Sequence, residues 1–367
     1  MVNGVIDEKS LSVFKEMVES FGPAGFELET SRIVKKYVSS FADEVVTDKL
    51  GSVIFKVKGE VERPHILVAG HIDEIGFVVS GVDEKTGFLT FNSVGGWFDQ
   101  NLLSQRVIVR TKSGDLSGVI ASKPPHVLQK EEVEKPVTRD KMFIDIGTTS
   151  KEETEKMGVR IGDPIVPWSP FQRIMNGKVL MGKAFDDRIG AFITMYTLRK
   201  LKEEDIRHPN TVYGAATVQE ELGARGASTV PYVVDPDVAI VVEVDIAGDV
   251  PGIKPNEAPA KMGKGPSIVT FDASMIPNQN LKELVIETAE QNKIPYQLTQ
   301  SPRGGTDAGR IHIHKTGCPS IVISVPTRHI HSHVSLASLE DVENTHRLIL
   351  ELLKTLDRKA VETLLPI

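Results

Sequence analysis

The sequence predicts an α/β protein whose main domain is interrupted by a small inserted β domain. After Gly182, strand-like apolar runs alternate with runs of helical periodicity, which is the rhythm of an α/β domain with a mixed or parallel sheet. Between Phe77 and Trp168 the chain instead shows short alternating stretches punctuated by glycine, and none resembles a long helix. That texture is typical of a small β barrel or sandwich. The 367 residues are enough for two unequal domains.

Residues 1–76 are expected to begin the main domain. Apolar side chains recur at helical spacing over residues 11–18 and 33–41, which predicts two amphipathic helices. Strand-like runs then predict three short strands, at Glu44–Asp48, Ser52–Lys58 and His65–Ala69.

Residues 77–168 are expected to form the inserted β domain. Its strand-like stretches are, in order, FVVSGV, GFLTF, RVIVRT, GVIAS and MFIDIG. Within this domain the charged segment Lys130–Lys141 surrounds Pro136, so we expect an exposed loop there.

Residues 169–367 are expected to complete the main domain. The patterns predict, in chain order, a helix at 187–201, strands at 211–218 and 238–244, a helix at 278–292, a strand at 320–325 and a helix from Ser338 onward.

Composition and charge limit the class of protein. Hydrophobic residues make up 40% and charged residues 25%, which is ordinary for a globular protein, and no apolar run approaches the roughly 20 residues of a membrane helix. The N-terminus lacks the basic start and apolar stretch of a secretory signal. The net charge of −7 argues against a nucleic-acid surface. We therefore expect a cytoplasmic protein that binds neither membrane nor nucleic acid.

Cys318 is the only cysteine, so the sequence has no disulfide framework and no thiolate zinc site. An apolar run follows Pro319, and we expect a buried, inert thiol. Any metal ion would have to be held by His and carboxylate side chains, which suits zinc, cobalt or manganese.

Histidines and acids gather where predicted strands end, and in α/β sheets these ends are where sites assemble. His71 and Asp73 close one strand. His71 could face a metal ion while Asp73 accepts its other ring N–H, and a hydrogen-bonded surface pair is the alternative. Asp186 precedes a helix and could bridge two cations, since a carboxylate has two oxygens, or could only cap the helix.

Two further strands carry pairs of acids. Glu220 and Glu221 lead into a glycine-rich turn, where one could bind metal and the other act as a general base. Glu243 and Asp245 lie within an apolar strand, where an unpaired charge is costly. Pairing with a metal ion or with a basic side chain would relieve that cost.

Three histidines, His329, His331 and His333, follow the predicted strand at 320–325. Alternating histidines after a buried strand favour a metal site over core packing, but the spacing does not choose among the three. The sequence contains neither a G-x-S-x-G elbow nor an H-E-x-x-H helix. A glycosidase site of two carboxylates stays open as an alternative and would leave the histidines unexplained.

Nine stretches form a distinctive set: GPAGFE at 22–27, DKLGSVI at 48–54, AGHIDEIGF at 69–77, VGGWFDQNLLSQRV at 94–107, GKAFDDRIG at 182–190, VQEELGARGA at 218–227, MGKGP at 262–266, GGTDAG at 304–309 and PTRHIHS at 326–332. In combination these stretches resemble the TET (tetrahedral) aminopeptidases, a group of co-catalytic zinc exopeptidases that includes deblocking and glutamyl aminopeptidases. The resemblance covers nearly the whole chain.

The resemblance implies a zinc-exopeptidase-like α/β/α catalytic domain, with the inserted β domain serving assembly, commonly into homododecamers. It implies a metal-dependent aminopeptidase that removes the N-terminal residue of peptides with a water activated by two divalent ions, Zn²⁺ or Co²⁺. The metal ligands that it implies are His71, Asp186, Glu221, Glu243 and His331.

The resemblance also assigns roles around these ligands. Asp186 would bridge the two ions, with His71 and Glu243 on one ion and Glu221 and His331 on the other. In addition, the general base would be Glu220, the partner of the His71 ring would be Asp73, and the Asp186–Asp187 peptide bond would be cis.

The sequence departs from the family pattern at three positions. The family more often has Asp where Glu243 stands, so Asp245 stays open as the alternative ligand; it often has Tyr at 329 and an acid where Ser335 stands. A related dinuclear deacylase or carboxypeptidase would use the same ligands on other substrates. An endoglucanase would need two carboxylates and no metal, and a non-catalytic binding protein would give no reason for Glu220.

Overall fold

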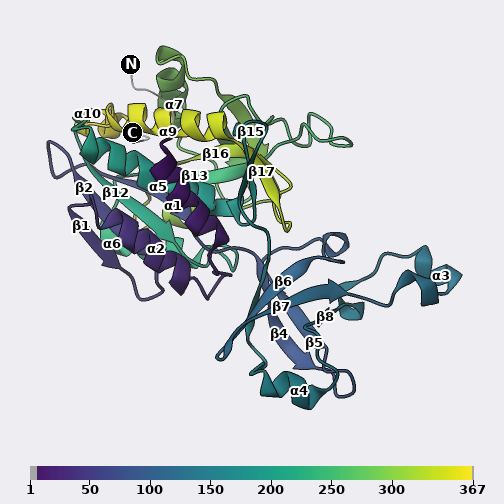
Figure 1. The fold of residues 1–367 in the computed structure, drawn as a ribbon. Helices are drawn as coiled ribbons and strands as arrows, with labels where there is room; N and C mark the ends of the chain where they lie inside the picture. The colour runs from purple at the N-terminus through teal and green to yellow at the C-terminus, as the bar shows by residue number, and fades with distance from the viewer. Residues whose placement is uncertain (1–5, 366–367) are drawn as a thin grey trace.

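The computed structural model describes residues 6–365 and consists of an α/β domain and a closed β barrel beside it (Figure 1). This confirms the predicted fold class and decides between barrel and sandwich for the inserted strands. The first five and last two residues of the predicted main domain lie outside the described residues. None of the helices in residues 6–365 is both long enough and apolar enough to cross a membrane.

The α/β domain is built on one mixed sheet of 11 strands within the described residues. Its main path is β1 (Glu44–Thr47), β2 (Val53–Lys58), β12 (Thr211–Thr217), β3 (His65–His71), β13 (Val238–Ile246), β16 (Ser320–Arg328), β17 (Ser335–Ser338), β11 (Val179–Gly182) and β10 (Gln172–Ile174). In addition, β14 (Ser267–Asp272) pairs with β16, and β15 (Gln297–Ser301) pairs with β14. The four central strands β12, β3, β13 and β16 are parallel, so their carboxyl ends meet at one edge of the sheet.

Helices cover both faces of the sheet. Because successive strand residues point to opposite faces, Ile66 and Val68 of β3 pack under one helical layer, and Leu67 and Ala69 under the other. The first layer contains α1 (Glu8–Glu19), α2 (Leu28–Val38), α5 (Phe185–Glu203), α7 (Gln279–Gln291) and α9 (Leu339–Leu353). The second contains α6 (Arg225–Val234) and α8 (Ala308–Ile311), and α10 (Arg358–Thr363) lies near the end of the chain. Cys318 is buried with the second layer as expected, and burial raises the pKa of its thiol to about 12.

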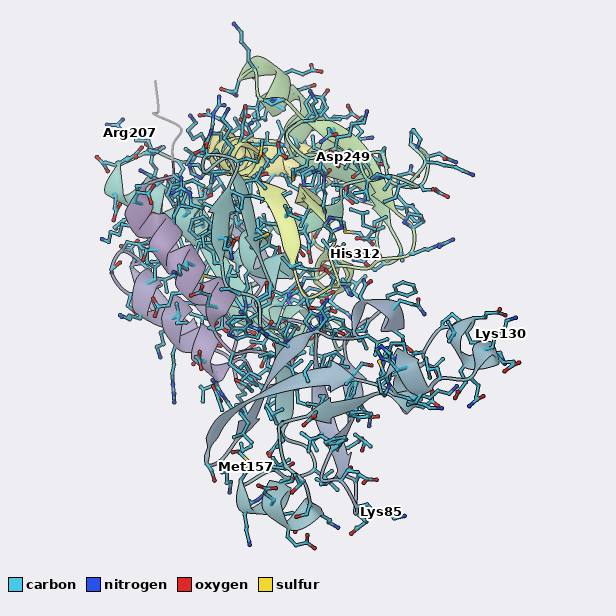
Figure 2. The ribbon with its side chains drawn as sticks, turned by 45° about the vertical axis from the view of Figure 1, so that its right-hand side comes forward. Lys85, Lys130, Met157, Arg207, Asp249 and His312 are labelled. Carbon is cyan, nitrogen blue, oxygen red and sulfur yellow. The ribbon has the colours of Figure 1, made fainter. Side chains whose placement is uncertain are left out.

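The barrel closes on itself in the order β4, β5, β8, β7, β6, β9. Its strands are β4 (Gly76–Val82), β5 (Leu89–Val94), β6 (Arg106–Thr111), β7 (Gly114–Ala121), β8 (Phe143–Asp145) and β9 (Pro164–Pro167). Alternate residues such as Val107 and Val109 point inward and fill the interior with Phe77 and Ile165. Lys85 and Met157 mark the end of the barrel far from the α/β domain (Figure 2).

The charged segment of the barrel is an exposed arm rather than a plain loop. It contains helix α3 (Lys130–Val133) and a 3-10 turn at Arg139–Lys141, and it projects outward with Lys130 near its tip (Figures 1 and 2). A second short helix, α4 (Lys151–Lys156), follows β8 and was not predicted from the sequence. Both helices are too short for helical periodicity to reveal them.

Candidate metal centre

The candidate ligands come together at the carboxyl edge of the central strands. His71 is the last residue of β3 and lies in register with Thr217, the last residue of β12. Glu221 follows β12 closely, Glu243 lies in β13, and His331 follows β16. Asp186 reaches the same edge from the first turn of α5, where its peptide bond to Asp187 is cis, as the resemblance implied.

The five expected ligands form two groups that share one residue. Ligand atoms of His71, Asp186 and Glu243 lie within 4.8 Å of one another, and so do those of Asp186, Glu221 and His331. Asp186 offers a different oxygen to each group: Oδ1 lies 3.2 Å from Nε2 of His71, and Oδ2 lies 3.2 Å from Nε2 of His331. This arrangement could hold two adjacent cations with the carboxylate of Asp186 between them.

Electrostatics support a cationic occupant of this cluster. Burial and the neighbouring Asp187 raise the pKa of Glu243 well above its ordinary value. Burial is the main cause that raises the pKa of Glu220 to about 9 and that of Glu221 to about 8. Neighbouring carboxylates raise both pKa values further, and the nearby histidines oppose the rise. Burial alone would lower the pKa of His331, but its hydrogen bond to Asp186 raises that pKa to about 10.

The closely packed carboxylates are therefore difficult to ionise without a cation. A bound divalent ion would offset the free-energy cost of ionising them. The donors are imidazole nitrogens and carboxylate oxygens with no thiolate among them. Such a set fits a divalent metal ion of the zinc, cobalt or manganese type.

Glu220 lies beside the ligand groups without belonging to either. Its Oε2 is 4.0 Å from Nε2 of His71. Together with Glu221 and His331 it lines a cavity of about 560 Å³. The cavity is also lined by Ser274 and by residues of the stretch GGTDAGR, namely Gly304, Gly305, Thr306, Gly309 and Arg310. The carboxylate of Glu220 thus faces both the candidate metal groups and a space large enough for a substrate residue.

Asp73 holds the turn that carries Glu220 and Glu221. Its two carboxylate oxygens accept the backbone N–H groups of these residues, each at 3.0 Å. The expected contact with His71 is only partly made by this carboxylate, whose Oδ1 lies 3.5 Å from Nδ1. The nearer partner of Nδ1 is the backbone oxygen of Asp73, at 3.2 Å. Asp73 is therefore placed to position both the ring and the turn.

Two buried acids that sequence reasoning did not single out complete this support. Oε1 of Glu27 accepts the backbone N–H of Gln219 at 3.1 Å, directly before the two glutamates of the turn. Oδ2 of Asp187 accepts the backbone N–H of His71 at 3.1 Å. Glu27 stands in the GPAGFE stretch and Asp187 beside Asp186, so the motifs contained both residues but gave no sign of these contacts.

The structure groups Glu243, and not Asp245, with His71. Residues two apart in a strand share a face, so periodicity alone does not choose between Glu243 and Asp245. In the structure a ligand atom of Glu243 lies within 4.8 Å of those of His71 and Asp186. The carboxylate of Asp245 is buried between β14 and β15, where the hydroxyls of Ser267 and Thr299 lie close to it.

Of the three candidate histidines, only His331 lies in a ligand group. His329 is exposed. His333 is buried against the ring of Trp97, with ring centroids 5.3 Å apart, and burial lowers its pKa to about 4. Alternation along the chain could not separate the three, because the backbone after β16 leaves the strand: φ is positive at both His329 and His331.

Comparisons with known proteins place the chain among similar proteins. A family model described as M42 glutamyl aminopeptidase matches residues 51–348. A crystal structure of a TET aminopeptidase from the marine sediment archaeon Thaumarchaeota archaeon SCGC AB-539-E09 has 62% sequence identity and a TM-score of 0.96, covering 98% of this chain and 99% of that chain.

Two further matches extend over nearly the whole chain. The lysyl aminopeptidase of Pyrococcus furiosus is 36% identical over 94% of this chain and 98% of its own length. A structure of the Pyrococcus horikoshii TET1 peptidase, described as able to assemble into a tetrahedron or a large octahedral shell, is 31% identical with a TM-score of 0.82, covering 95% of this chain and 100% of that chain.

Proposed function

The chain belongs to the M42 glutamyl aminopeptidase family, and from this premise we propose that it removes the N-terminal residue of peptides with two divalent metal ions and a glutamate base. As a member of this family it is a metallo-aminopeptidase, a hydrolase that acts with divalent metal. The observation that carries the finer proposal is the pair of ligand groups that share Asp186.

The proposed ligands divide between two ions. His71 and Glu243 would hold one ion, Glu221 and His331 the other, and Asp186 both. The ions, with Zn²⁺ or Co²⁺ as the expected identity, would lower the pKa of a water and polarise the scissile carbonyl. Nδ1 of each imidazole faces a backbone oxygen, which leaves Nε2 free to face the cluster.

The remaining residues would handle the proton and the geometry. Glu220 would take a proton from the attacking water and give it to the leaving amine. Asp73 would keep Glu220 in place through the backbone of the turn. The cavity beside Glu220 would accept the N-terminal residue of the peptide.

The test is a panel of aminoacyl chromophores assayed with and without EDTA, followed by addition of Zn²⁺ or Co²⁺. We expect release of the chromophore from free N-terminal residues, its loss in EDTA and its recovery with metal. N-acetylated analogues of the same substrates are the control and should not be cleaved. Activity that survives complete removal of metal, or cleavage confined to acylated substrates, would contradict the proposal.

We further propose that residues 77–168 are an inserted oligomerisation domain and that the protein forms a homo-oligomer, with twelve chains as the expected number. The support is the likeness to the TET1 peptidase, which is described as able to assemble into a tetrahedron or a large octahedral shell. Light scattering after size exclusion should give about twelve times the 40.2 kDa chain mass. A cytoplasmic location, peptide substrates and the lack of membrane or nucleic-acid partners stay predictions from the sequence.

A further inference from the structure

The two candidate imidazole ligands are held in different ways. Nδ1 of His71 faces the backbone oxygen of Asp73, two residues further along the same chain segment, at 3.2 Å. Nδ1 of His331 donates to the backbone oxygen of Gly96 at 2.8 Å, across 235 positions of sequence. Gly96 belongs to the barrel, in the loop that follows β5. One ligand group is thus oriented from within the α/β domain, and the other depends on the insert.

The contact fixes the chemistry of the His331 ring. A carbonyl oxygen only accepts hydrogen bonds, so Nδ1 of His331 carries a proton and Nε2 is the nitrogen that can offer a lone pair to a metal ion. That Nε2 lies 3.2 Å from Oδ2 of Asp186 and 3.6 Å from Oε1 of Glu221. A hydrogen bond of this kind sets the tautomer of a metal-binding histidine and raises its basicity.

The loop also approaches Glu221, the other unshared member of this ligand group. A Cβ atom added at Gly95 would come within 2.9 Å of Oε2 of Glu221 and within 2.5 Å of Cγ2 of Ile75. Gly95 has φ of +76°, which favours glycine. At Gly96 a Cβ atom would lie 3.1 Å from Nδ1 of His331. A side chain at Gly95 would therefore clash and strain the backbone, and one at Gly96 would press on the His331 ring.

The barrel holds this loop firmly through Trp97. Its ring stacks on Phe77 of β4 with centroids 4.7 Å apart, and its Nε1–H donates to the backbone oxygen of Gly76 at 3.0 Å. Arg139 donates to the backbone oxygen of Trp97 at 3.3 Å and pairs with Asp99 at 2.6 Å. The loop is therefore a fixed part of the barrel surface.

His331 has little other support for its orientation. Its side chain is 40% exposed, whereas that of His71 is 1% exposed. Its backbone has φ of 54° and lies beyond the end of β16, so no strand geometry aims the ring. Among the described residues, the ring contacts Asp186 and Glu221 of its own ligand group, and its hydrogen bond outside that group is the one to Gly96.

We propose that the barrel loop Val94–Trp97 completes the ligand group of Asp186, Glu221 and His331, and that Gly96 is a positioning residue for His331. This inference rests on the proposed two-ion function. It gives the insert a role in metal binding that is separate from assembly. It also makes the two ion sites unequal, since the group of His71, Asp186 and Glu243 has no such contact with the barrel among the described residues.

The experiment compares the metal content of purified protein with that of Gly96→Ala. This substitution leaves the carbonyl in place but brings a methyl group against the His331 ring. Gly81→Ala is the matched control, because it lies in β4 and its Cβ would meet the rotatable hydroxyl of Thr90. Trp97→Phe is a second, milder variant that keeps an aromatic ring on Phe77 but removes the hydrogen bond to Gly76.

Zn²⁺ affinity is measured by competition with a chelating dye, and the Co²⁺-loaded forms are compared by d–d absorption. We expect two ions per chain in the unsubstituted protein and in Gly81→Ala. In Gly96→Ala one of the two ions should bind about 10- to 100-fold more weakly, the usual effect of losing such a supporting contact, with a changed Co²⁺ spectrum for that ion only. Trp97→Phe should weaken the same ion by a smaller factor.

The outcomes separate the two proposals. Unchanged affinity of both ions in Gly96→Ala and Trp97→Phe would overturn the role of the loop while leaving the two-ion site intact. Equal weakening of both ions would also overturn it, because a general loss of structure would then explain the result. Fewer than two ions in the unsubstituted protein would contradict the proposed function and this inference with it.

Discussion

Glu220 shows how the backbone places one side chain beside the candidate metal groups without making it a ligand. Its backbone N–H donates a hydrogen bond to Asp73, and the backbone N–H of the preceding residue, Gln219, donates one to Glu27. Gln219 has φ of 58°, so the chain leaves the regular strand geometry at this point. In a regular strand Glu220 and Glu221 would face opposite sides. The turn lets both side chains line the same cavity.

Replacing Glu220 by Gln should leave two metal ions per chain and lower kcat by about 10²- to 10⁴-fold, the range of general acid–base catalysis. The amide keeps the shape of the side chain but does not take up the proton. Steady-state kinetics and elemental analysis measure the two quantities. Glu131→Gln, in the exposed arm, is the control and should behave like the unsubstituted protein. Near-normal turnover of Glu220→Gln would contradict its assignment as the base.

Replacing His331 by Ala should remove at least one metal ion per chain, because Glu221 and Asp186 alone would be left to hold it. His329→Ala is the matched control, since that side chain is exposed and lies outside both ligand groups. It should keep both ions. Elemental analysis after dialysis gives the answer, and equal metal content in the two variants would count against His331 as a ligand.

Several of these residues could be selected from the sequence because acids and histidines at the ends of apolar strands are unusual. The choice between Glu243 and Asp245 could not be made, because the two-residue repeat of a strand puts both on one face. Glu27 and Gly96 could not be assigned contacts at all. Their partners lie about 190 and 235 positions away, and local patterns carry no information on such pairs.

At the scale of elements, the strongest packing joins the central sheet to α5, and α5 in turn to α9. Fifteen of the 19 residues of α5 are buried, so this helix lies between the sheet and its outer neighbours. A polar contact crosses the α5–α9 interface: Oγ1 of Thr197 and Nδ1 of His346 are 2.9 Å apart and buried. Burial lowers the pKa of His346 from 6.5 to about 3, so the ring is neutral in the folded protein near neutral pH.

This interface should contribute to the pH dependence of stability. The folded-state pKa of His346 lies below that of the unfolded chain, so the unfolded chain binds a proton first. The resulting stability is present above about pH 6.5 and is lost as the pH falls toward 3. Between these pH values, each unit of pH decrease should lower the free energy of unfolding of the unsubstituted protein by up to about 1.4 kcal/mol more than that of His346→Gln.

Denaturant unfolding between pH 7 and pH 5 measures this difference. His126→Gln, at an exposed histidine that precedes the arm, is the control and should follow the unsubstituted protein. Parallel pH profiles of the unsubstituted protein and His346→Gln would show that His346 is not the source of the dependence.

The long amphipathic helices and the apolar central strands could be predicted because each has a strong repeat of 3.6 or 2 residues. The closure of the insert into a barrel could not, because alternation is the same in a barrel and a sandwich. Closure depends on the pairing of β9 with both β4 and β6, which joins segments about 60 to 90 residues apart. The short strands β17, β11 and β10 at one end of the sheet also lacked a pattern, since their three or four residues are too few.

At the scale of the whole molecule, the candidate metal centre lies where the two domains meet. The sheet edge supplies the ligands, and the barrel loop covers one side of them. The acids of the cluster repel one another when no cation is present, and this repulsion opposes folding of both domains around the site.

Removal of metal should therefore lower the stability of the whole chain. A ligand that binds only the folded state stabilises it by about 4 kcal/mol at a thousand times its Kd. We expect the Tm to fall in EDTA and to recover with excess Zn²⁺ or Co²⁺, as followed by differential scanning fluorimetry. The shift should be smaller in His331→Ala, which has fewer ligands to lose. A Tm that is unchanged by EDTA would contradict a metal centre at this position.

The strand order has a consequence for the newly made protein. The ligands run from His71 to His331, and the strand that leads to the last of them, β16, lies between β13 and β17 in the sheet. During translation β3 and β12 emerge early, but β13 keeps an open edge until β16 has left the ribosome. A nascent chain shorter than 331 residues lacks the second imidazole. The proposed second ion site can therefore form only after β16 and His331 have been synthesised.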